Sequence, residues 1–189
     1  MQCGHESQKE NVRTGSRTGG GKLVTEIFDA QRKKQIAEKI LHCLPDWFGL
    51  PESTKRYIEE SAGMPFWAWC EDEKDGGKAE KAAETEDKAS GFLALKETSP
   101  HTAEIYVMGV VPERHHRGIG RELCLAFERY AAQKGYSFLQ VKTVQSGHYE
   151  EYDRTNAFYR AMGFKELECL PSLWDEQNPC QIYVKYIGV

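Results

Sequence analysis

The stretch VVPERHHRGIGRELCLAFERYAAQKG, residues 110–135, contains the change of pattern that decides the fold. An apolar run stops at Pro112, and a group of histidines and arginines follows before two glycines at positions 118 and 120. Beyond them, apolar residues recur with the spacing of one helix face, which predicts a helix over residues 118–134. The stretch therefore predicts a strand, a basic loop with two glycines and a helix in direct succession.

This loop has the features of a phosphate-binding loop. Gly118 and Gly120 remove side chains, so backbone N–H groups can approach a ligand closely, and the start of a helix carries partial positive charge. Arg114, Arg117 and Arg121 add positive charge around the loop. Such an arrangement is typical of sites that bind phosphate or pyrophosphate.

The two common nucleotide-binding motifs do not fit the loop. A Rossmann fingerprint requires a third glycine where Leu123 stands, and an acidic residue on the next strand, which FLQVKTV lacks. A P-loop requires Gly-Lys-Ser/Thr, which is absent from the stretch. The phosphate of some other ligand is therefore expected here.

The elements on either side follow from alternation and helical periodicity. Asp29 is placed to cap the first helix, which ends before Pro45. The predicted strands cover 23–28, 64–70, 90–97, 102–111, 138–144, 164–170 and 181–187, and the further helices cover 53–62, 118–134 and a segment from 153 or 155 to 162. The order β-α-α-β-β-β-α-β-α-β-β predicts an α+β (mixed α/β) protein, a mixed sheet with helices on its faces.

Composition limits the class of protein. The 189 residues, of which 40% are hydrophobic, suit one domain with a buried core. No apolar run approaches the roughly 18 residues that indicate a membrane span. Residues 1–21 are polar, lack the apolar segment of a secretory signal and predict a disordered lead-in to a single domain over residues 22–189.

The net charge of −4 is concentrated in one segment. Residues 71–88 contain eight acids and four lysines, which account for the whole net charge. The rest of the chain is near neutral, which argues against nucleic acid as a partner. Residues 72–88 predict a flexible acidic loop between two strands.

The six cysteines are scattered, with no C-x-x-C pair and no Cys/His spacing that suits zinc. Reduced thiols are expected, as in a cytoplasmic protein. His115 and His116 do not predict a metal site, because neighbours in a loop seldom converge on one ion, and no metal is expected. Whether Cys169 and Cys180 face each other on the last strands stays open.

The run PERHHRGIGRELC resembles the acetyl-CoA pyrophosphate loop of the GNAT superfamily of N-acetyltransferases. The family form Gln/Arg-x-x-Gly-x-Gly/Ala reads here as His115-x-x-Gly118-x-Gly120, and His115 departs from the usual Gln or Arg. NAFYRAMGF, residues 156–164, resembles the second family signature. The resemblance covers roughly Phe92 to the C-terminus and implies the GNAT fold, with a central, mixed, mostly antiparallel sheet flanked by helices.

The resemblance also implies acetyl-CoA as cosubstrate and a set of residues that bind it. Main-chain groups of Met108, Gly109 and Val110 match the place where the family's fourth strand splays, and a glycine inside a strand also suits a bulge or a close ligand. Asn156 matches a residue that reaches the pantetheine or phosphate arm, although it equally suits a helix N-terminus. The loop residues matched to the pyrophosphate site are His115, His116, Arg117, Gly118, Ile119, Gly120 and Arg121.

Two residues match the catalytic groups of the family. Glu104 matches the general-base glutamate, and alternation places Tyr106 and Met108 on its sheet face. The alternative for Glu104 is a surface glutamate paired with a lysine. Tyr159 matches the tyrosine that donates a proton to the leaving thiolate, and its alternative is core packing.

The acceptor pocket is expected where the first two helices and neighbouring loops meet. Trp47, Phe48 and Trp67 are candidates for its walls, and core packing is equally plausible for Trp67. His148 is an alternative base, and Glu150 could attract a cationic substrate. Both also fit an exposed surface loop.

These observations predict an N-acetyltransferase that transfers the acetyl group of acetyl-CoA directly to a primary amine of a small molecule. A protein or peptide N-acetyltransferase and a non-catalytic CoA-binding regulatory module are the alternatives, and a longer acyl donor stays open. No membrane partner is expected. Homodimerisation is a habit of the family that the chain itself does not demonstrate.

Overall fold

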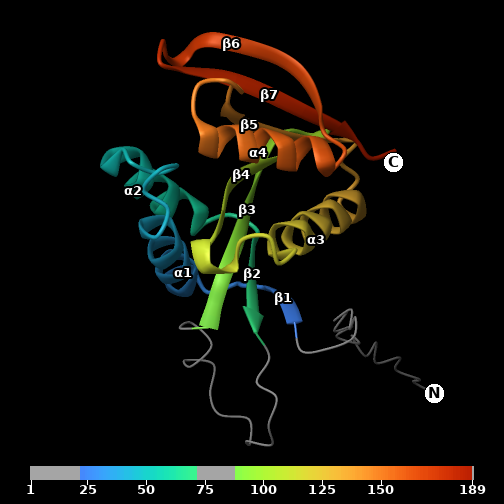
Figure 1. Ribbon diagram of the computed structural model, residues 1–189. Helices are drawn as coiled ribbons and strands as arrows, with labels where there is room; N and C mark the ends of the chain where they lie inside the picture. Colours follow the sequence, from blue (N-terminus) through green and yellow to red (C-terminus); the bar gives the residue numbers. More distant parts are fainter. Residues whose placement is uncertain (1–21, 72–87, 189) are drawn as a thin grey trace, which may run out of the picture.

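The computed structural model describes residues 22–71 and 88–188, which form a seven-stranded sheet with helices on both faces (Figure 1). The lead-in predicted for residues 1–21 and nearly all of the acidic loop predicted for 72–88 lie outside the described residues. The predicted order of elements is confirmed. The elements are β1 (Lys22–Glu26), α1 (Ala30–His42), α2 (Pro51–Ser61), β2 (Phe66–Glu71), β3 (Ala89–Ser99), β4 (Thr102–Val110), α3 (Ile119–Gln133), β5 (Phe138–Val144), α4 (Glu150–Ala161), β6 (Lys165–Asp175) and β7 (Asn178–Tyr186).

The strands follow the order β1-β2-β3-β4-β5-β7-β6. Among the described strands, β4 and β5 form the one parallel pair, and every other neighbouring pair is antiparallel. The sheet is therefore mixed and mostly antiparallel, as predicted. None of the helices in the described ranges is long and apolar enough to cross a membrane.

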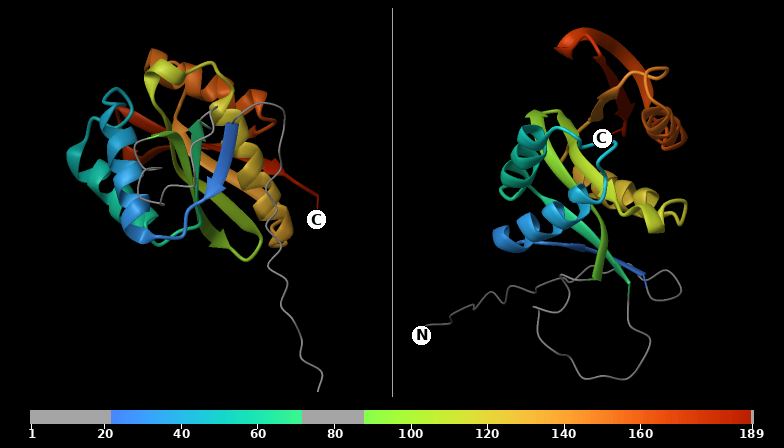
Figure 2. Two further views of the ribbon diagram at one scale, coloured as in Figure 1. Left: turned by 90° about the horizontal axis from the view of Figure 1, so that it is seen from below. Right: turned by 60° about the vertical axis from the view of Figure 1, so that its left-hand side comes forward.

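Helices cover both faces of the sheet (Figure 2). The sheet thereby separates the core into two clusters, one on each face. On one face, Ile36 and Ile40 of α1 and Ile58 of α2 pack against β2, β3 and β4. On the other face, Leu123 and Phe127 of α3 belong to the cluster that also holds side chains of α4. Each helix has one apolar face, and the sheet between them buries both sets.

The parallel ladder between β4 and β5 is short. It runs from Thr102 opposite Phe138 to Ile105 opposite Val141, while β4 continues to Val110 beside β3. Beyond this point β5 pairs with β7 alone. The two central strands therefore diverge and leave an opening between their C-terminal ends.

A β-bulge in β4 corrects the predicted alternation. Ala94 pairs with Val107 but Leu95 pairs with Ile105, so β4 carries one extra residue, Tyr106. Ile105 and Met108 pack with the α3 cluster, whereas Tyr106 and Val107 pack with the α1 and α2 cluster. Met108 therefore does not share the face of Tyr106, because the bulge reverses the alternation.

Gly109 does not lie at the bulge, and its lack of a side chain instead allows close packing. A Cβ at this position would lie 2.9 Å from Cγ2 of Ile40 and 3.1 Å from Cδ1 of Leu44. Glycine therefore allows α1 to approach β4 closely, immediately below the opening.

Two helices begin earlier than predicted. Pro51 opens α2 in place of a Ser53 cap, because proline suits the first turn of a helix. Asp153 does not start α4 either, since its Oδ1 accepts hydrogen bonds from the Gly147 amide at 2.6 Å and the Ser146 hydroxyl at 2.7 Å. Asp29 caps α1 as predicted, accepting a hydrogen bond from the Arg32 amide at 2.7 Å.

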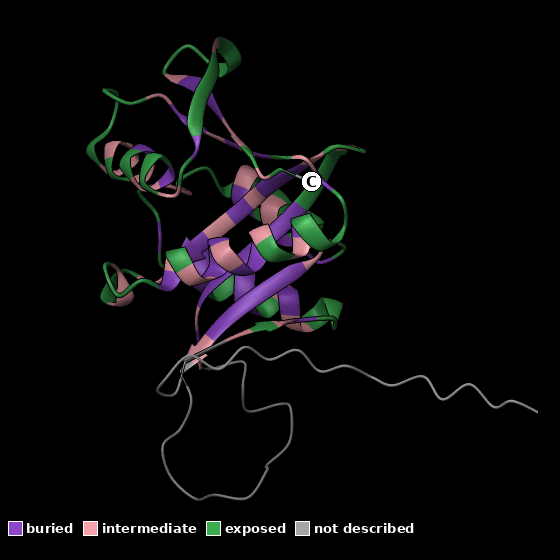
Figure 3. Cartoon of the chain, turned by 90° about the vertical axis from the view of Figure 1, so that its right-hand side faces the viewer, coloured by how far each residue is buried: buried purple, intermediate pink, exposed green. Residues whose placement is uncertain are grey.

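The β6–β7 hairpin extends further than predicted and projects beyond the helices. Most of β6 is exposed, while the central strands are buried (Figure 3). Cys169 lies opposite Gln181 and Cys180 lies opposite Leu170, so the two cysteines do not face each other directly. Both thiols are free.

Candidate active site

A cleft of about 1270 Å³ occupies the opening between β4 and β5. Its walls come from the α1–α2 loop, α2, the end of β4, the β4–α3 loop, β5, α4 and the β6–β7 hairpin. Segments far apart in the sequence thus meet at the one place where the central ladder is interrupted.

The glycine-containing loop forms one end of the cleft. His116 has a positive φ of 59°, and Gly118, which precedes the first residue of α3, has a φ of 83°. A Cβ at Gly118 would meet no atom within 4 Å, so backbone conformation rather than space favours glycine there. Gly118 has no side chain to cap α3, which leaves the first amides of the helix to a ligand.

The loop is attached to β4 by His115. Its Nε2 lies 2.7 Å from the main-chain oxygen of Val110, and its ring lies edge-on to Trp47 at 5.9 Å between centroids. This side chain therefore supports the loop from within, where the family form has Gln or Arg. Of the predicted coenzyme-binding residues, the cleft is lined by Met108, Gly109, Val110, His115, His116, Gly118, Ile119 and Gly120.

Arg117 and Arg121 are exposed, and the structure does not place them in the cleft wall. Gly120 allows α3 to approach α4, because a Cβ there would lie 3.3 Å from Cζ of Phe158. The loop thus presents mainly its backbone and the start of α3 to the cleft.

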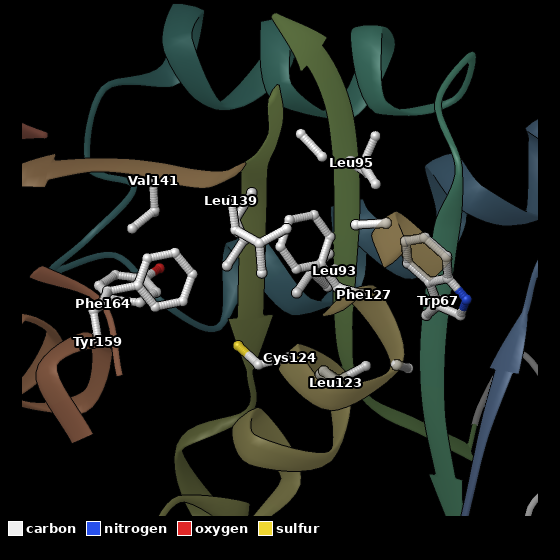
Figure 4. Close-up of a cluster of buried hydrophobic side chains, with 14 of the residues drawn as sticks. Trp67, Leu93, Leu95, Leu123, Cys124, Phe127, Leu139, Val141, Tyr159 and Phe164 are labelled. Atoms are coloured by element: carbon white, nitrogen blue, oxygen red, sulfur yellow. The ribbon is translucent and has the colours of Figure 1, made fainter. Parts of the chain in front are cut away.

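Tyr159 projects from α4 into the wall of the cleft and is 6% exposed. Its ring contacts those of Phe158 and Tyr183, with centroids 5.4 and 6.3 Å away, and that of Phe164, with centroids 5.9 Å apart (Figure 4). Burial raises the pKa of the Tyr159 phenol well above its usual value. The phenol therefore stays protonated at neutral pH and can donate a hydrogen bond into the cleft.

Asn156 does not lie at the coenzyme-binding position that the resemblance implies. The residue is fully buried, and its Nδ2 donates to the main-chain oxygens of Val144 at 2.9 Å and Tyr152 at 2.6 Å. Its Oδ1 accepts a hydrogen bond from the Tyr183 hydroxyl at 2.8 Å. These bonds tie α4 to β5 and β7, so Asn156 positions the helix and does not line the cleft.

Glu104 lies at the base of the opening and is 6% exposed. Its Oε2 accepts a hydrogen bond from Nε2 of Gln140 at 2.6 Å and forms an ion pair with Nζ of Lys142. Lys142 lines the cleft, while Glu104 lies behind it. The lysine partner foreseen for Glu104 is therefore present, although the pair is largely buried rather than on the surface.

The α1–α2 loop covers the cleft and is fastened to the opposite wall. Nε1 of Trp47 donates to Oγ1 of Thr155 at 3.0 Å, and the Tyr152 hydroxyl donates to the main-chain oxygen of Trp47 at 2.9 Å. Phe48 also lines the cleft. We call these two hydrogen bonds the Trp47 bridge.

Three predicted acceptor residues lie away from the cleft. Trp67 belongs to the core beneath α3, with its ring 5.0 Å from that of Tyr130 and at the opposite end of the cluster from Tyr159 (Figure 4). His148 is exposed on the β5–α4 loop. Glu150 is exposed and forms an ion pair with Arg154 at 2.7 Å.

Sequence reasoning missed the tyrosines of the acceptor side. Tyr57, Tyr106 and Tyr152 line the cleft from α2, β4 and α4. Two of them could have been found from the sequence, because Tyr57 lies on the half-buried side of α2 and Tyr152 lies one helical turn before Asn156. The position of Tyr106 could not, because the residue pattern does not indicate the bulge. The Tyr106 hydroxyl donates to Oε2 of Glu60 at 2.5 Å.

Cys124 is unsuited to act as a nucleophile. Its thiol is buried in the α3 cluster, and burial raises its pKa to about 12. Only the thiolate reacts well, so this residue would be inert at neutral pH.

Residues 37–164 match the model of the Acetyltransferase (GNAT) family. The chain belongs to this family of acetyltransferases. The match includes β4, the glycine loop, α3, β5 and α4, which build most of the cleft. No curated protein sequence matches the chain.

Several solved structures share the fold of this chain. An acetyltransferase from Streptococcus agalactiae is 18% identical, with a TM-score of 0.64 over 88% of this chain and 99% of that one. An aminoglycoside 6'-N-acetyltransferase complexed with coenzyme A is 16% identical, with a TM-score of 0.63 over 88% and 98%. Ard1 from Thermoplasma volcanium is 14% identical, with a TM-score of 0.60 over 89% and 99%.

The Asn156 network predicts a loss of stability when it is broken. Asn156→Ala should lower the free energy of unfolding by about 2 to 3 kcal/mol, since it leaves buried polar groups without partners. Tyr183→Phe removes one donor and should cost about 1 kcal/mol. Urea unfolding measures both, with Gln133→Ala on the exposed side of α3 as the control. A loss in Asn156→Ala as small as that of the control would contradict the network.

Proposed function

We propose that the chain is an acetyl-CoA-dependent N-acetyltransferase that transfers the acetyl group directly to a primary amine of a small molecule. The observation that carries this proposal is the convergence of the glycine loop, the diverging ends of β4 and β5, and Tyr159 on one cleft. Membership of the acetyltransferase family supports it.

The cleft suits a long ligand with a phosphate group. At about 1270 Å³ it exceeds the roughly 300 to 1000 Å³ of an ordinary ligand pocket, so it has room for an acyl carrier and an acceptor together. The uncapped start of α3 and the main-chain amides of the loop are fitted to hold the pyrophosphate of acetyl-CoA. A solved neighbour of the same fold is complexed with coenzyme A.

The end of β4 is placed to hold the thioester. The β4–β5 ladder ends at Ile105, so the main chain at Met108, Gly109 and Val110 faces the cleft without a strand partner on that side. Main-chain amides that point at the carbonyl oxygen stabilise the negative charge that develops there during acyl transfer. We assign this role to that segment.

The transfer requires one bond to form and one to break. The nitrogen of the neutral amine attacks the carbonyl carbon, the new C–N bond forms, and the C–S bond breaks with its electron pair on sulfur. The amine loses a proton and the thiolate gains one. Cys124 is buried and poorly acidic, which favours direct transfer over a covalent acyl-cysteine intermediate.

Tyr159 is the proposed donor to the leaving thiolate. A phenol with a raised pKa is a weaker acid than a thiol of pKa about 8.5, so full proton transfer is uphill in the ground state. A hydrogen bond from the phenol still stabilises the negative sulfur as the C–S bond breaks. Burial among aromatic rings fixes the phenol in one orientation.

Glu104 is the proposed acceptor of the amine proton. An alkylamine with a pKa of about 10.4 is mostly protonated at pH 7, and its deprotonation costs about 4 to 5 kcal/mol. Glu104 lies behind the cleft wall, so the proton would reach the carboxylate through one water molecule. Lys142 and Gln140 hold this carboxylate in place.

The central test is release of coenzyme A thiol from acetyl-CoA with a panel of amines, followed by a chromogenic thiol reagent. Isothermal titration calorimetry with acetyl-CoA measures binding independently. Binding with amine-dependent thiol release is expected. Binding without release would favour a CoA-binding module, and release with peptides alone would favour a protein acetyltransferase.

Glu104→Gln should lower kcat about 10²- to 10⁴-fold at pH 7, since a general base contributes about that factor. The loss should shrink as the pH approaches the pKa of the amine, at about 10, where the neutral amine no longer needs a base. A pH–rate profile from pH 6 to 10 measures this, with Glu150→Gln as the matched carboxylate control. A loss that stays constant across that range would remove Glu104 as the base.

Tyr159→Phe should reduce kcat about 10²- to 10⁴-fold, as expected for loss of a positioned proton donor. Affinity for acetyl-CoA should change little, because the ring and its contacts remain. Steady-state kinetics and calorimetry separate the two effects, and Tyr186→Phe, which changes an exposed tyrosine outside the cleft, is the control. Full turnover in Tyr159→Phe would refute the donor role.

A further inference from the structure

We infer that the acceptor is an arylalkylamine, with one aliphatic primary amine joined through a short alkyl chain to a planar ring system. This inference rests on the proposed function and specifies its substrate class. It follows from the side chains that form the acceptor side of the cleft and from the charges among them.

One wall of the acceptor side is a continuous row of rings. Phe48 lies edge-on to Tyr57 with centroids 5.8 Å apart, and Tyr57 lies edge-on to Tyr106 at 5.3 Å. The three residues come from the α1–α2 loop, α2 and the bulge of β4, and all line the cleft. The row therefore joins the outer loop to the strand that holds the thioester.

Rings from other elements complete the enclosure. Tyr152 of α4 and Trp174 near the tip of the β6–β7 hairpin both line the cleft, and Trp47 covers it. Burial is the main cause that raises the pKa of the Tyr152 phenol to about 12, and its hydroxyl is occupied by the Trp47 bridge. Trp174 is 43% exposed, so a large apolar ring stands at the mouth of the cleft.

Three carboxylates near these rings, those of Glu60, Glu104 and Asp175, are already engaged. Glu60 accepts the hydrogen bond of Tyr106, and Glu104 is paired with Lys142. Asp175 accepts hydrogen bonds from the amides of Gln177 and Asn178 in the hairpin turn. These groups are held by the protein rather than presented to a cation.

The charges of the cleft wall do not favour a polycationic acceptor. Among the described residues that line the cleft, three are acidic and four are lysine or arginine, so the wall carries no excess of negative charge. The acids are Asp46, Glu151 and Asp175, while Lys142 is paired with Glu104 and Arg154 with Glu150. The wall is therefore close to neutral and presents no strongly negative surface to the several ammonium groups of a polyamine or aminoglycoside.

The rings of the cleft wall instead suit an acceptor that contains an aromatic ring. Ring-to-ring contacts add about 2- to 10-fold each in affinity beyond burial of apolar area. The rings also exclude water from the reacting nitrogen, which helps it to attack as the neutral amine. A single amine on an aromatic body therefore suits this cleft better than a polyamine or a straight alkylamine.

The test compares kcat/KM for phenethylamine, tyramine and tryptamine with hexylamine, spermidine and kanamycin. The aromatic amines should exceed hexylamine at least 10-fold and the polycations by more. Equal or higher values for hexylamine, spermidine or kanamycin would overturn the inference and leave acetyl transfer in place. Thiol release with none of the amines would overturn the proposed function as well.

Ring variants connect the preference to the wall. Tyr57→Leu and Phe48→Leu should each lower kcat/KM for tryptamine about 10-fold and change that for hexylamine less than about 3-fold. Tyr57→Phe keeps the ring and should retain the preference. Tyr186→Leu, which removes an exposed ring outside the cleft, is the matched control. An equal loss for both amines in the Leu variants would mean that the rings do not select the acceptor.

Discussion

The candidate site depends on the point where the parallel ladder between β4 and β5 ends. β4 and β5 share four residue pairs, from Thr102 opposite Phe138 to Ile105 opposite Val141, and then diverge because each has a different partner. Strand edges without partners inside a fold leave polar main-chain groups that need another ligand. The divergence therefore creates both the space and the hydrogen-bonding groups of the candidate site.

The two faces of the sheet contribute differently to this opening. On one face, α1 approaches β4 through the space left at Gly109 and positions the loop that carries Trp47 and Phe48. On the other face, Asn156 bonds α4 to β5 and β7, so Tyr159 is presented from a fixed helix. The walls that the α1–α2 loop and α2 contribute and the wall that α4 contributes are thus supported by two separate packing clusters.

Local patterns in the sequence predicted those features that depend on interactions between neighbouring residues. The order of elements, the Asp29 cap and the glycine loop before α3 all follow from neighbouring residues, and the structure has them. Contacts between distant segments could not be predicted in this way. The bulge at Tyr106 depends on the register with β3, and the core position of Trp67 depends on which face α3 covers. The buried bonds of Asn156 likewise join residues whose proximity only the folded sheet decides.

The Trp47 bridge joins residues 108 and 105 positions apart in the chain, from the α1–α2 loop to α4. A first ligand that displaces this bridge binds more weakly, because part of its binding free energy is used to break the two hydrogen bonds. A second ligand that enters the same opened cleft does not meet that cost again. Two hydrogen bonds across a cleft are thus enough to couple its occupants thermodynamically, and the coupling is reciprocal, because each ligand raises the affinity for the other by the same factor.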